Sequence, residues 1–433
     1  MGLTRKAAFY TLGCKVNQYE TENIKKQFLE RGYEEENFEN CADVYIINSC
    51  TVTNLADRKT RNMLRRAKSL NPESTVVATG CYAQTNAEDI ARIPEVDYII
   101  GNSDKKRIAE IVIAKTENKI NVKNIFEESE YQENGFTTLR EMTRAYIKIQ
   151  DGCDNFCSYC KIPFARGKKR SRNPEKIIDE VRELVKEGYS EIILIGINLG
   201  AYSEDFENKV TLDEIIDKVS LENGVKRVRI GSIYPDKISD NLIELMAKRE
   251  NIMPHLHISM QSGSDRILKL MKRKYCKSDI KRVFDKIRKK IPDIEFTCDI
   301  ITGFPGERDE DFEEGAEFIE SLKFSNVHIF QYSDRENTEA SKMAEKVEPK
   351  IKKERSEKLE IRVNKIGEEI RKSYIDKKVK LLVEEIEENF SYGYSENYIR
   401  IKSEETDVKP GDILQVIVKK VEKGMLIGGK KNI

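Results

Sequence analysis

Short apolar runs alternate with amphipathic segments over most of this 433-residue chain, and this alternation limits the possible folds more than any other feature. In the first stretch, the apolar runs predict buried strands at residues 7–12, 44–48, 75–79 and 97–100. The segments between them predict helices at residues 18–31, 55–70 and 84–92. Strands that alternate with helices in this way predict a parallel α/β sheet.

A second alternating series follows a polar, acidic stretch at residues 116–140, which we interpret as a linker. Its predicted strands are residues 146–150, 191–195, 227–231, 255–260, 295–301 and 327–332. Its predicted helices are residues 174–187, 211–220, 237–248, 265–290 and 308–322. Six βα units, fewer than a complete barrel has, predict a partial (β/α)6 barrel with its site at the carboxyl ends of the strands.

The chain changes character after this barrel. Residues 349–374 are almost all charged or apolar at helical spacing and predict one long helix. Strands are then predicted at residues 379–384, 398–401, 413–418 and 425–427, which is typical of a small β-barrel. The expected fold class is therefore α/β, with an N-terminal domain at 1–120, the partial barrel at 138–348, a linker helix at 349–371 and the β-barrel at 372–433.

Charge and cysteine content narrow the class of protein. Lysine plus arginine and aspartate plus glutamate each number 76, so any affinity for nucleic acid must come from local patches. No apolar run approaches the roughly 20 residues of a membrane span, which predicts a cytoplasmic protein with no membrane partner. The nine cysteines are few for a disulfide scaffold and odd in number, which favours metal ligation or redox chemistry.

Three of these cysteines, Cys153, Cys157 and Cys160, form a CxxxCxxC triplet directly after the first predicted barrel strand. A 4Fe-4S cluster normally takes four thiolates, so three local cysteines would leave one iron open to a substrate. The alternative is a zinc site with a fourth ligand from elsewhere. Zinc sites usually use CxxC pairs, and the chain offers no partner pair, so the cluster is favoured.

Cys14, Cys50 and Cys81 each follow one of the first three predicted strands. Because ligands of open parallel sheets bind outside the carboxyl ends of the strands, we expect these three thiols to converge. The other three cysteines have no such placement, and we expect each to be a small, buried apolar residue: Cys41, Cys276 and Cys298.

Several motifs resemble those of the radical S-adenosylmethionine methylthiotransferase family. The three N-terminal cysteine motifs of that family are similar to TLGCKVNQYET, INSCTVT and TGCYAQ, and its cluster loop is similar to DGCDNFCSYCKIPFARGKKRSR. Its later barrel motifs are similar to ISMQSGSDRILKLMKRKY and DIITGFPGE, and its C-terminal RNA-binding TRAM domain to GYSENYIRIK. The resemblance spans nearly the whole chain. One departure is Asn337, where the family usually has glycine.

The resemblance implies two 4Fe-4S clusters. Cys153, Cys157 and Cys160 would hold the radical cluster, whose open iron binds S-adenosylmethionine, and reductive cleavage would yield a 5′-deoxyadenosyl radical. The remaining set of cysteine motifs would hold an auxiliary cluster that supplies the sulfur: Cys14, Cys50 and Cys81. Beyond these ligands no catalytic acid or base is required. We accordingly expect His255 and His257 to line the barrel rather than to bind a metal.

The resemblance also suggests contacts to S-adenosylmethionine. Tyr159 matches an aromatic residue that lies against the adenine, and Gly196 matches a segment that approaches the methionine amino group. Four polar residues near the ends of later strands are weaker candidates, for which a structural role fits as well: Arg229, Ser232, Gln261 and Asp299.

RNA contact should leave a basic footprint. Residues 161–176 and 58–68 are rich in lysine and arginine beside the two cysteine sites, and the last module adds lysines at 419–431, with Tyr392, Tyr394 and Tyr398 available for stacking. GCKVNQYET resembles the branch of the family that methylthiolates N6-threonylcarbamoyladenosine at tRNA adenosine-37. The expected partners are therefore the tRNA anticodon stem-loop, a flavodoxin- or ferredoxin-type electron donor and a sulfur donor.

Three alternatives remain open from the sequence. The chain could act on isopentenylated adenosine in tRNA, or on an aspartate of a ribosomal protein. It could also be a zinc-containing RNA-binding protein without enzymatic activity.

Overall fold

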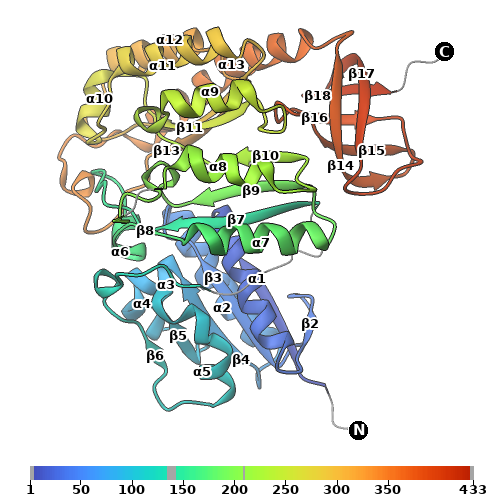
Figure 1. Cartoon of the computed structure of the whole chain (residues 1–433). Helices are drawn as coiled ribbons and strands as arrows, with labels where there is room; N and C mark the ends of the chain where they lie inside the picture. Colours follow the sequence, from blue (N-terminus) through green and yellow to red (C-terminus); the bar gives the residue numbers. More distant parts are fainter. Residues whose placement is uncertain (1–3, 134–142, 208–209, 430–433) are drawn as a thin grey trace.

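The computed structural model describes residues 4–133, 143–207 and 210–429 (Figure 1). Its N-terminal part is a parallel sheet with strand order β2-β1-β3-β4-β5-β6. The strands are β1 (Lys6–Thr11), β2 (Glu34–Glu36), β3 (Val44–Ser49), β4 (Thr75–Gly80), β5 (Tyr98–Ile100) and β6 (Ile120–Asn121). The helices are α1 (Lys15–Leu29), α2 (Asn54–Leu70), α3 (Cys81–Thr85), α4 (Ala87–Ala91) and α5 (Ile108–Ile113). The predicted parallel α/β sheet is confirmed.

Both faces of this sheet are buried, as in other parallel sheets covered by helices. Successive side chains of β3 point to opposite faces: Tyr45 and Ile47 pack with α2, whereas Val44 and Ile46 pack with α1. This explains why the strand is apolar without alternation in the sequence.

Six parallel strands form the predicted partial barrel: β7 (Arg144–Asp151), β9 (Glu191–Gly196), β10 (Arg227–Ile230), β11 (His255–Gln261), β12 (Glu295–Thr302) and β13 (Asn326–Gln331). The short strand β8 (Arg170–Ser171) pairs antiparallel with β7. Parallel bridges between Val228 and Ile252 and between Ile233 and Ile258 connect the two halves into one open arc. Its helices are α6 (Ile162–Arg166), α7 (Pro174–Lys186), α8 (Leu212–Leu221), α9 (Asp240–Lys248), α10 (Asp265–Leu270), α11 (Lys277–Lys290) and α12 (Asp309–Ser321).

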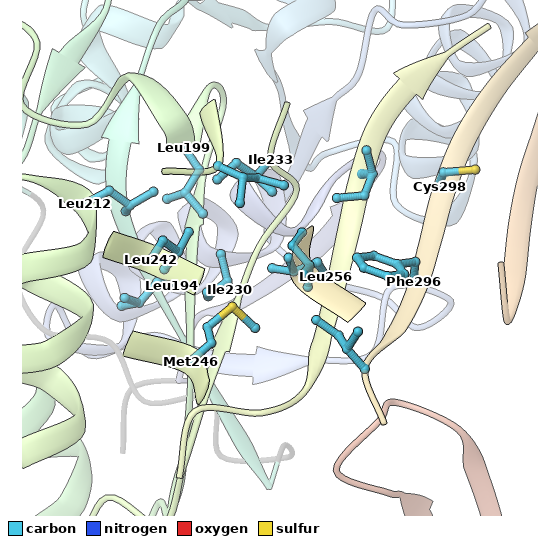
Figure 2. Close-up of a cluster of buried hydrophobic side chains, with 14 of the residues drawn as sticks. Leu194, Leu199, Leu212, Ile230, Ile233, Leu242, Met246, Leu256, Phe296 and Cys298 are labelled. Carbon is cyan, nitrogen blue, oxygen red and sulfur yellow. The ribbon is translucent and has the colours of Figure 1, made fainter. Parts of the chain in front are cut away.

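The core of this barrel lies between the strands and their outer helices. Leu194, Leu256 and Phe296 on three strands join one buried apolar cluster with Leu212 of α8 (Figure 2). Cys298 belongs to the same cluster and is fully buried, which confirms its predicted role as a small apolar residue.

Four sequence predictions were wrong in detail. Cys41 is exposed, and Cys276 is only partly buried because it caps the start of α11, where its N–H donates to Asp279 (3.1 Å). Residues 265–290 form two helices because the backbone turns at Lys272, which has φ of 59°. Residues 84–92 likewise contain a break between α3 and α4 at Asn86. Strands β2, β6, β8 and β15 were not predicted.

The C-terminal part begins with α13 (Pro349–Lys372) and continues as a closed barrel with strand order β14-β15-β16-β18-β17. Its strands are β14 (Lys378–Glu387), β15 (Phe390–Tyr394), β16 (Arg400–Ser403), β17 (Ile413–Glu422) and β18 (Met425–Gly429). The long helix and the small β-barrel were both predicted. In the described ranges, no helix combines the length and the apolar character needed to cross a membrane.

The small barrel is fixed to the amino end of the large one through the loop at residues 394–397. Arg229 donates to the carbonyls of Ser395 (2.6 Å) and Glu396 (2.9 Å). Asn397 donates in turn to the carbonyl of Asp293, just before β12 (2.5 Å). These hydrogen bonds, two of them from the charged guanidinium of Arg229, hold this loop against the starts of the barrel strands, so the C-terminal module lies at that end.

Candidate active site

The Cys153–Cys160 triplet lies in the loop that leaves β7 at the carboxyl end of the barrel. The loop is fixed by backbone hydrogen bonds from Cys153 N–H to the Gly167 carbonyl (3.0 Å) and from Cys160 N–H to the Cys157 carbonyl (2.9 Å). Burial raises the pKa of Cys153 to about 11 and that of Cys160 to about 12, and the adjacent Cys157 thiol acts in the same direction. Such thiols act as ligands where a metal centre stabilises their thiolates.

Arg273 lies beside this triplet and forms no ion pair with any described residue. It donates to the Tyr159 hydroxyl (2.9 Å) and its guanidinium lies over the ring of Tyr234, 4.7 Å from the centroid. Its Nε is buried and has no hydrogen-bond partner. Arg273 is thus an unpaired cation with an unsatisfied N–H beside three cysteines. This environment fits a negatively charged group bound by the cysteines, such as a thiolate-ligated cluster.

The second set of cysteines converges at the carboxyl edge of the N-terminal sheet. Cys14 lies between β1 and α1, Cys50 follows β3, and Cys81 begins α3 directly after β4. Strands β1, β3 and β4 are neighbours in the sheet. Burial raises the pKa of Cys50 to about 12, and the thiols of Cys81 and Cys14 lie close enough to act in the same direction. The structure thus brings the three predicted residues together.

Two glycines make this convergence possible. Gly13 has φ of 109°, and a Cβ placed there would lie 2.8 Å from the Cβ of Cys50. Gly80 has φ of 94°, and its Cβ would lie 2.4 Å from the Ser49 carbonyl oxygen. Neither position accepts a side chain, so the backbone itself packs the three strand ends together.

Arg166 links the two cysteine sites. It lies on α6, a few residues after the triplet, and is 1% exposed. Its Nε lies 3.3 Å from the Cys81 sulfur, and its terminal nitrogens donate to Asn17 (2.6 Å) and bidentately to Glu20 of α1. Helix α6, which follows the triplet, therefore supplies a buried cation to the site formed by Cys14, Cys50 and Cys81.

The surroundings of Arg166 carry an excess of positive charge. Lys148 pairs with both Glu20 (2.8 Å) and Asp151 (2.6 Å). Four buried cations surround these two carboxylates: Lys105, Lys148, Arg166 and Arg170. Buried charge normally occurs in balance, and a thiolate-ligated cluster at Cys81 would supply the missing negative charge.

Each cysteine set supplies three thiols, one fewer than the four thiolates that a 4Fe-4S cluster normally takes. Thiolates are the usual ligands of iron–sulfur clusters, so the chemistry of both donor sets fits such a cluster. Across the described ranges, no three His, Cys, Asp or Glu side chains are arranged around a single metal ion.

A cavity of about 840 Å³ extends from Cys14 into the barrel interior. It is lined by Cys14 and Lys15 of the N-terminal domain, by barrel strands from β7 to β13, and by the C-terminal module through Tyr394 and Tyr398. It is large enough for a nucleoside. All three parts of the chain contribute to its wall.

The residues predicted to contact S-adenosylmethionine lie in different parts of the site. Four of them line the cavity: Gly196, Arg229, Ser232 and Asp299. Gly196 lies against Gln150, whose Cβ would be 3.1 Å from an added Cβ. Gln261 ends β11 with φ of 72°, and Tyr159 packs edge-on to Phe304 beside the triplet. Arg229 also pairs with Glu191 (2.7 Å) and holds the C-terminal module, which gives its guanidinium partners other than a cofactor.

The interpretation of residues 161–176 as an RNA footprint is wrong for most of its cations. Four of them are buried, because carboxylates or amides distant in sequence bind them: Lys161, Arg166, Arg170 and Arg172. On α2, by contrast, Arg58, Lys59 and Arg65 are exposed and form no ion pair with a described residue.

The tyrosines predicted to stack on RNA are also used differently. Tyr394 and Tyr398 stack on each other at 4.7 Å, and Tyr398 also contacts His255. Both rings belong to the cavity wall rather than to an open RNA surface. Tyr392 lies beside Lys402, and Lys430 and Lys431 lie outside the described residues.

Sequence reasoning missed Lys15, Arg166 and Tyr398 as residues of the site. The only signal for Lys15 was its position next to Cys14, and Arg166 was visible only as one member of a basic run. Their partners come from parts of the chain far away in sequence.

Comparison with known proteins agrees with this architecture. Residues 147–319 match the profile of the Radical SAM superfamily, and residues 6–101 match that of "Uncharacterized protein family UPF0004". The structure resembles that of the radical S-adenosylmethionine methyltransferase TsrM from Kitasatospora setae, with a TM-score of 0.59 and 13% identity over 78% of this chain and 77% of that one. At this identity the likeness concerns the fold alone.

Sequence relatives cover almost the whole chain. The chain is 41% identical to threonylcarbamoyladenosine tRNA methylthiotransferase MtaB of Bacillus subtilis (strain 168), over 95% of this chain and 93% of that protein. It is 40% identical to the protein of the same name from Aquifex aeolicus, over 92% and 97%. It is 35% identical to tRNA-2-methylthio-N(6)-dimethylallyladenosine synthase of Acetivibrio thermocellus, over 86% and 79%. The chain is therefore an enzyme of the radical S-adenosylmethionine methylthiotransferase family.

Proposed function

We propose that this enzyme converts N6-threonylcarbamoyladenosine at position 37 of tRNA to its 2-methylthio derivative. The names of the 41% and 40% identical relatives support this substrate, as does the motif GCKVNQYET around the first cysteine. The observation that carries the proposal is the shared cavity. A target base inside it would meet the auxiliary cysteine Cys14 and the barrel interior at once.

Two 4Fe-4S clusters would serve this reaction, one at each cysteine set: Cys153, Cys157 and Cys160, and Cys14, Cys50 and Cys81. When bound, they would supply reductive cleavage of S-adenosylmethionine at the first site and a transferable methylated sulfur at the second. Arg166 would hold the two sites close together, because it extends from α6, directly after the triplet, to the Cys81 sulfur.

The remaining groups position the reactants. Tyr159, Gly196, Ser232, Gln261 and Asp299 are our candidates for contacts to S-adenosylmethionine. Asp299 is held by His257 (3.2 Å), which fixes its orientation in the cavity wall.

The rest of the RNA would bind outside the cavity. The exposed cations lie on α2, the helix that follows Cys50, and the C-terminal barrel lies at the starts of the barrel strands. We infer that the anticodon stem-loop contacts both. Each turnover would need an electron to start the cleavage of S-adenosylmethionine and would use up a sulfur atom, so the enzyme needs an electron donor of the flavodoxin or ferredoxin type and a sulfur donor.

Nucleoside mass spectrometry of tRNA from cells with and without the gene tests this function. We expect loss of 2-methylthio-N6-threonylcarbamoyladenosine and accumulation of its unmethylthiolated precursor, with rescue by the intact gene. Loss of the 2-methylthio-isopentenyl nucleoside instead would assign the enzyme to the substrate of the dimethylallyladenosine relatives. Unchanged tRNA would contradict the proposal.

A further inference from the structure

The cavity wall carries far more positive than negative charge. Asp299 is its one carboxylate among the lining residues, and His257 holds it. Four cations line the same space: Lys15, Arg229, Arg371 and Arg400. The reaction proposed above does not by itself require cations at these positions.

Two of these cations have carboxylate partners. Arg229 pairs with Glu191 (2.7 Å), and Arg400 pairs with Glu384 (3.6 Å) and also with Glu385. Their charges are compensated inside the protein. They therefore do not explain the excess.

The other two form no ion pair with a described residue, although the Glu368 carboxylate interacts with Arg371 at longer range. Lys15 forms no ion pair with any described residue, and its ammonium lies 5.6 Å from the ring centre of Tyr398 and 5.8 Å from that of Tyr146. Arg371 makes one long hydrogen bond, to the Ser325 carbonyl (3.4 Å), and its Nε is buried without a partner. Lys15 is also the first residue of α1, where the helix dipole adds positive potential.

The pKa values of two neighbouring side chains reflect this positive potential. Burial by itself would raise the pKa of the Tyr398 phenol, but Lys15, Arg144 and Arg229 together bring it below its ordinary value. Burial lowers the pKa of His255 well below its usual range, and nearby cations, Lys15 among them, act in the same direction. The imidazole is therefore neutral near pH 7 and adds no charge to this end of the cavity.

We propose that Lys15, assisted by Arg371, forms a subsite for a carboxylate, and that this carboxylate belongs to the amino-acid substituent on N6 of the target adenosine. This inference rests on the proposed function and identifies what would select its substrate. The threonylcarbamoyl group ends in a carboxylate, which a lysine ammonium binds through a charge-assisted hydrogen bond. An isopentenyl group offers no such partner, so it would not pair with Lys15, which is exposed to solvent in the free protein.

S-adenosylmethionine also carries a carboxylate, but its place is at the other end of the barrel. Tyr146 and His255, which surround Lys15, lie near the starts of β7 and β11, whereas the triplet follows the end of β7. At about 3.3 Å per residue, the Lys15 end lies roughly 16–20 Å from the carboxyl ends of these strands. A methionine bound at the triplet cannot reach it.

The test measures binding of anticodon stem-loop RNAs to the reconstituted full-length enzyme without reductant, so that no turnover occurs. Three RNAs are compared, carrying N6-threonylcarbamoyladenosine, its neutral methyl ester, or unmodified adenosine at position 37. For the wild-type enzyme we expect the acid to bind about tenfold or more tightly than the ester, the effect of a hydrogen bond to a charged group. This arm needs no variant and does not depend on its folding.

Lys15→Met should remove the preference for the acid over the ester and leave binding of the unmodified RNA unchanged, whereas Lys15→Arg should keep the preference. Lys26→Met, on the same helix but outside the cavity wall, is the matched control and should behave as wild type. Iron content and affinity for S-adenosylmethionine are measured in each variant. A loss of cofactor affinity in Lys15→Met would assign the subsite to the methionine carboxylate and overturn the proposal.

Other outcomes separate the two proposals. If wild type binds acid and ester equally but still methylthiolates the threonylcarbamoyl RNA, the subsite is wrong and the proposed function stands. If wild type methylthiolates only isopentenylated RNA, the proposed function itself fails. An equal loss for all three RNAs in Lys15→Met would mean that Lys15 contacts the RNA backbone, which also contradicts the subsite.

Discussion

The two cysteine sites of this protein are built in opposite ways. Cys153, Cys157 and Cys160 come from one loop of eight residues, whereas Cys14, Cys50 and Cys81 come from three strand ends more than 30 residues apart. The first site needs only its loop to be held in place. The second exists only when the N-terminal sheet is correctly formed, because its ligands meet through the register of β1, β3 and β4.

The two sites are therefore vulnerable to different substitutions. A local triplet should survive changes elsewhere in the chain, whereas an assembled site should respond to any change in the packing of the strand ends. Arg166 is the exception to their independence, since it lies on α6, directly after the first loop, and contacts the second site.

The largest effects should come from removing one ligand of each site in turn. Cys157→Ala should abolish cleavage of S-adenosylmethionine, whereas Cys50→Ala should leave cleavage intact but abolish formation of the methylthio product. The reason is that each substitution removes a thiolate from only one cluster. Chromatography of 5′-deoxyadenosine and of the RNA nucleosides measures both. Cleavage that persists in Cys157→Ala would show that the radical site has been misassigned.

Arg166→Gln should be the next most damaging change, because it removes a buried cation from both Cys81 and Glu20. We expect a loss of about 3 kcal/mol in stability, at the low end for a broken buried pair because Lys105 and Lys148 still neutralise Glu20. The reduction potential of the auxiliary cluster should fall by on the order of 100 mV, as for a unit charge roughly 6 Å away.

Redox titration followed by electron paramagnetic resonance measures this shift in the Cys157→Ala background, where the auxiliary cluster is alone. Arg166→Lys, which keeps the charge but loses the bidentate contact, should shift the potential less. Equal potentials in all three proteins would mean that Arg166 only supports the fold.

Gly80→Ala tests the dependence of the assembled site on strand packing. The added Cβ would lie 2.4 Å from the Ser49 carbonyl oxygen in a backbone with φ of 94°, so we expect a loss of about 2–4 kcal/mol and incomplete auxiliary iron. Gly32→Ala is the matched control, since its φ is 81° but no atom lies within 4 Å of the added Cβ. It should cost only about 1–2 kcal/mol and retain its iron. Thermal unfolding and iron analysis compare the two.

The smallest effect should arise at Glu295, far from both sites. Burial raises the pKa of Glu295 to about 7, and its carboxyl accepts a hydrogen bond from Tyr374 (3.1 Å). Because the folded-state pKa lies above the unfolded one, this group's contribution is present below about pH 4.5 and is lost as the pH rises through about 7, on the order of 2–3 kcal/mol.

Glu295→Gln should therefore remove part of the loss of stability between pH 5.5 and pH 8.5, as measured by thermal unfolding. Both cluster sites should keep their iron. A pH profile identical to that of wild type would show that Glu295 does not titrate in this range.

The sequence could predict the strands of both sheets because parallel strands buried on two faces are continuous apolar runs, as at residues 192–195. It could not predict the break at Lys272, since a charged residue with positive φ carries no turn signal there. The departure at Asn337 proved compatible with the fold, because asparagine tolerates the left-handed backbone it adopts, with φ of 65°.

The candidate site could also be predicted only in part. Its six cysteines were visible as motifs in the sequence, but the roles of the cations were not. Arg166 and Arg172 lay in a basic run typical of an RNA surface, yet Glu20 and Glu180 bind them in the interior. Which cation meets which carboxylate depends on the packing of α1 and α7 against β7, and no local pattern specifies that packing.

Iron and sulfide analysis of the anaerobically reconstituted protein tests the central claim of two separable sites most directly. Wild type should bind about eight irons, and Cys157→Ala and Cys50→Ala should each retain about four. Four irons in wild type, or loss of all iron in either variant, would contradict two independent three-cysteine sites.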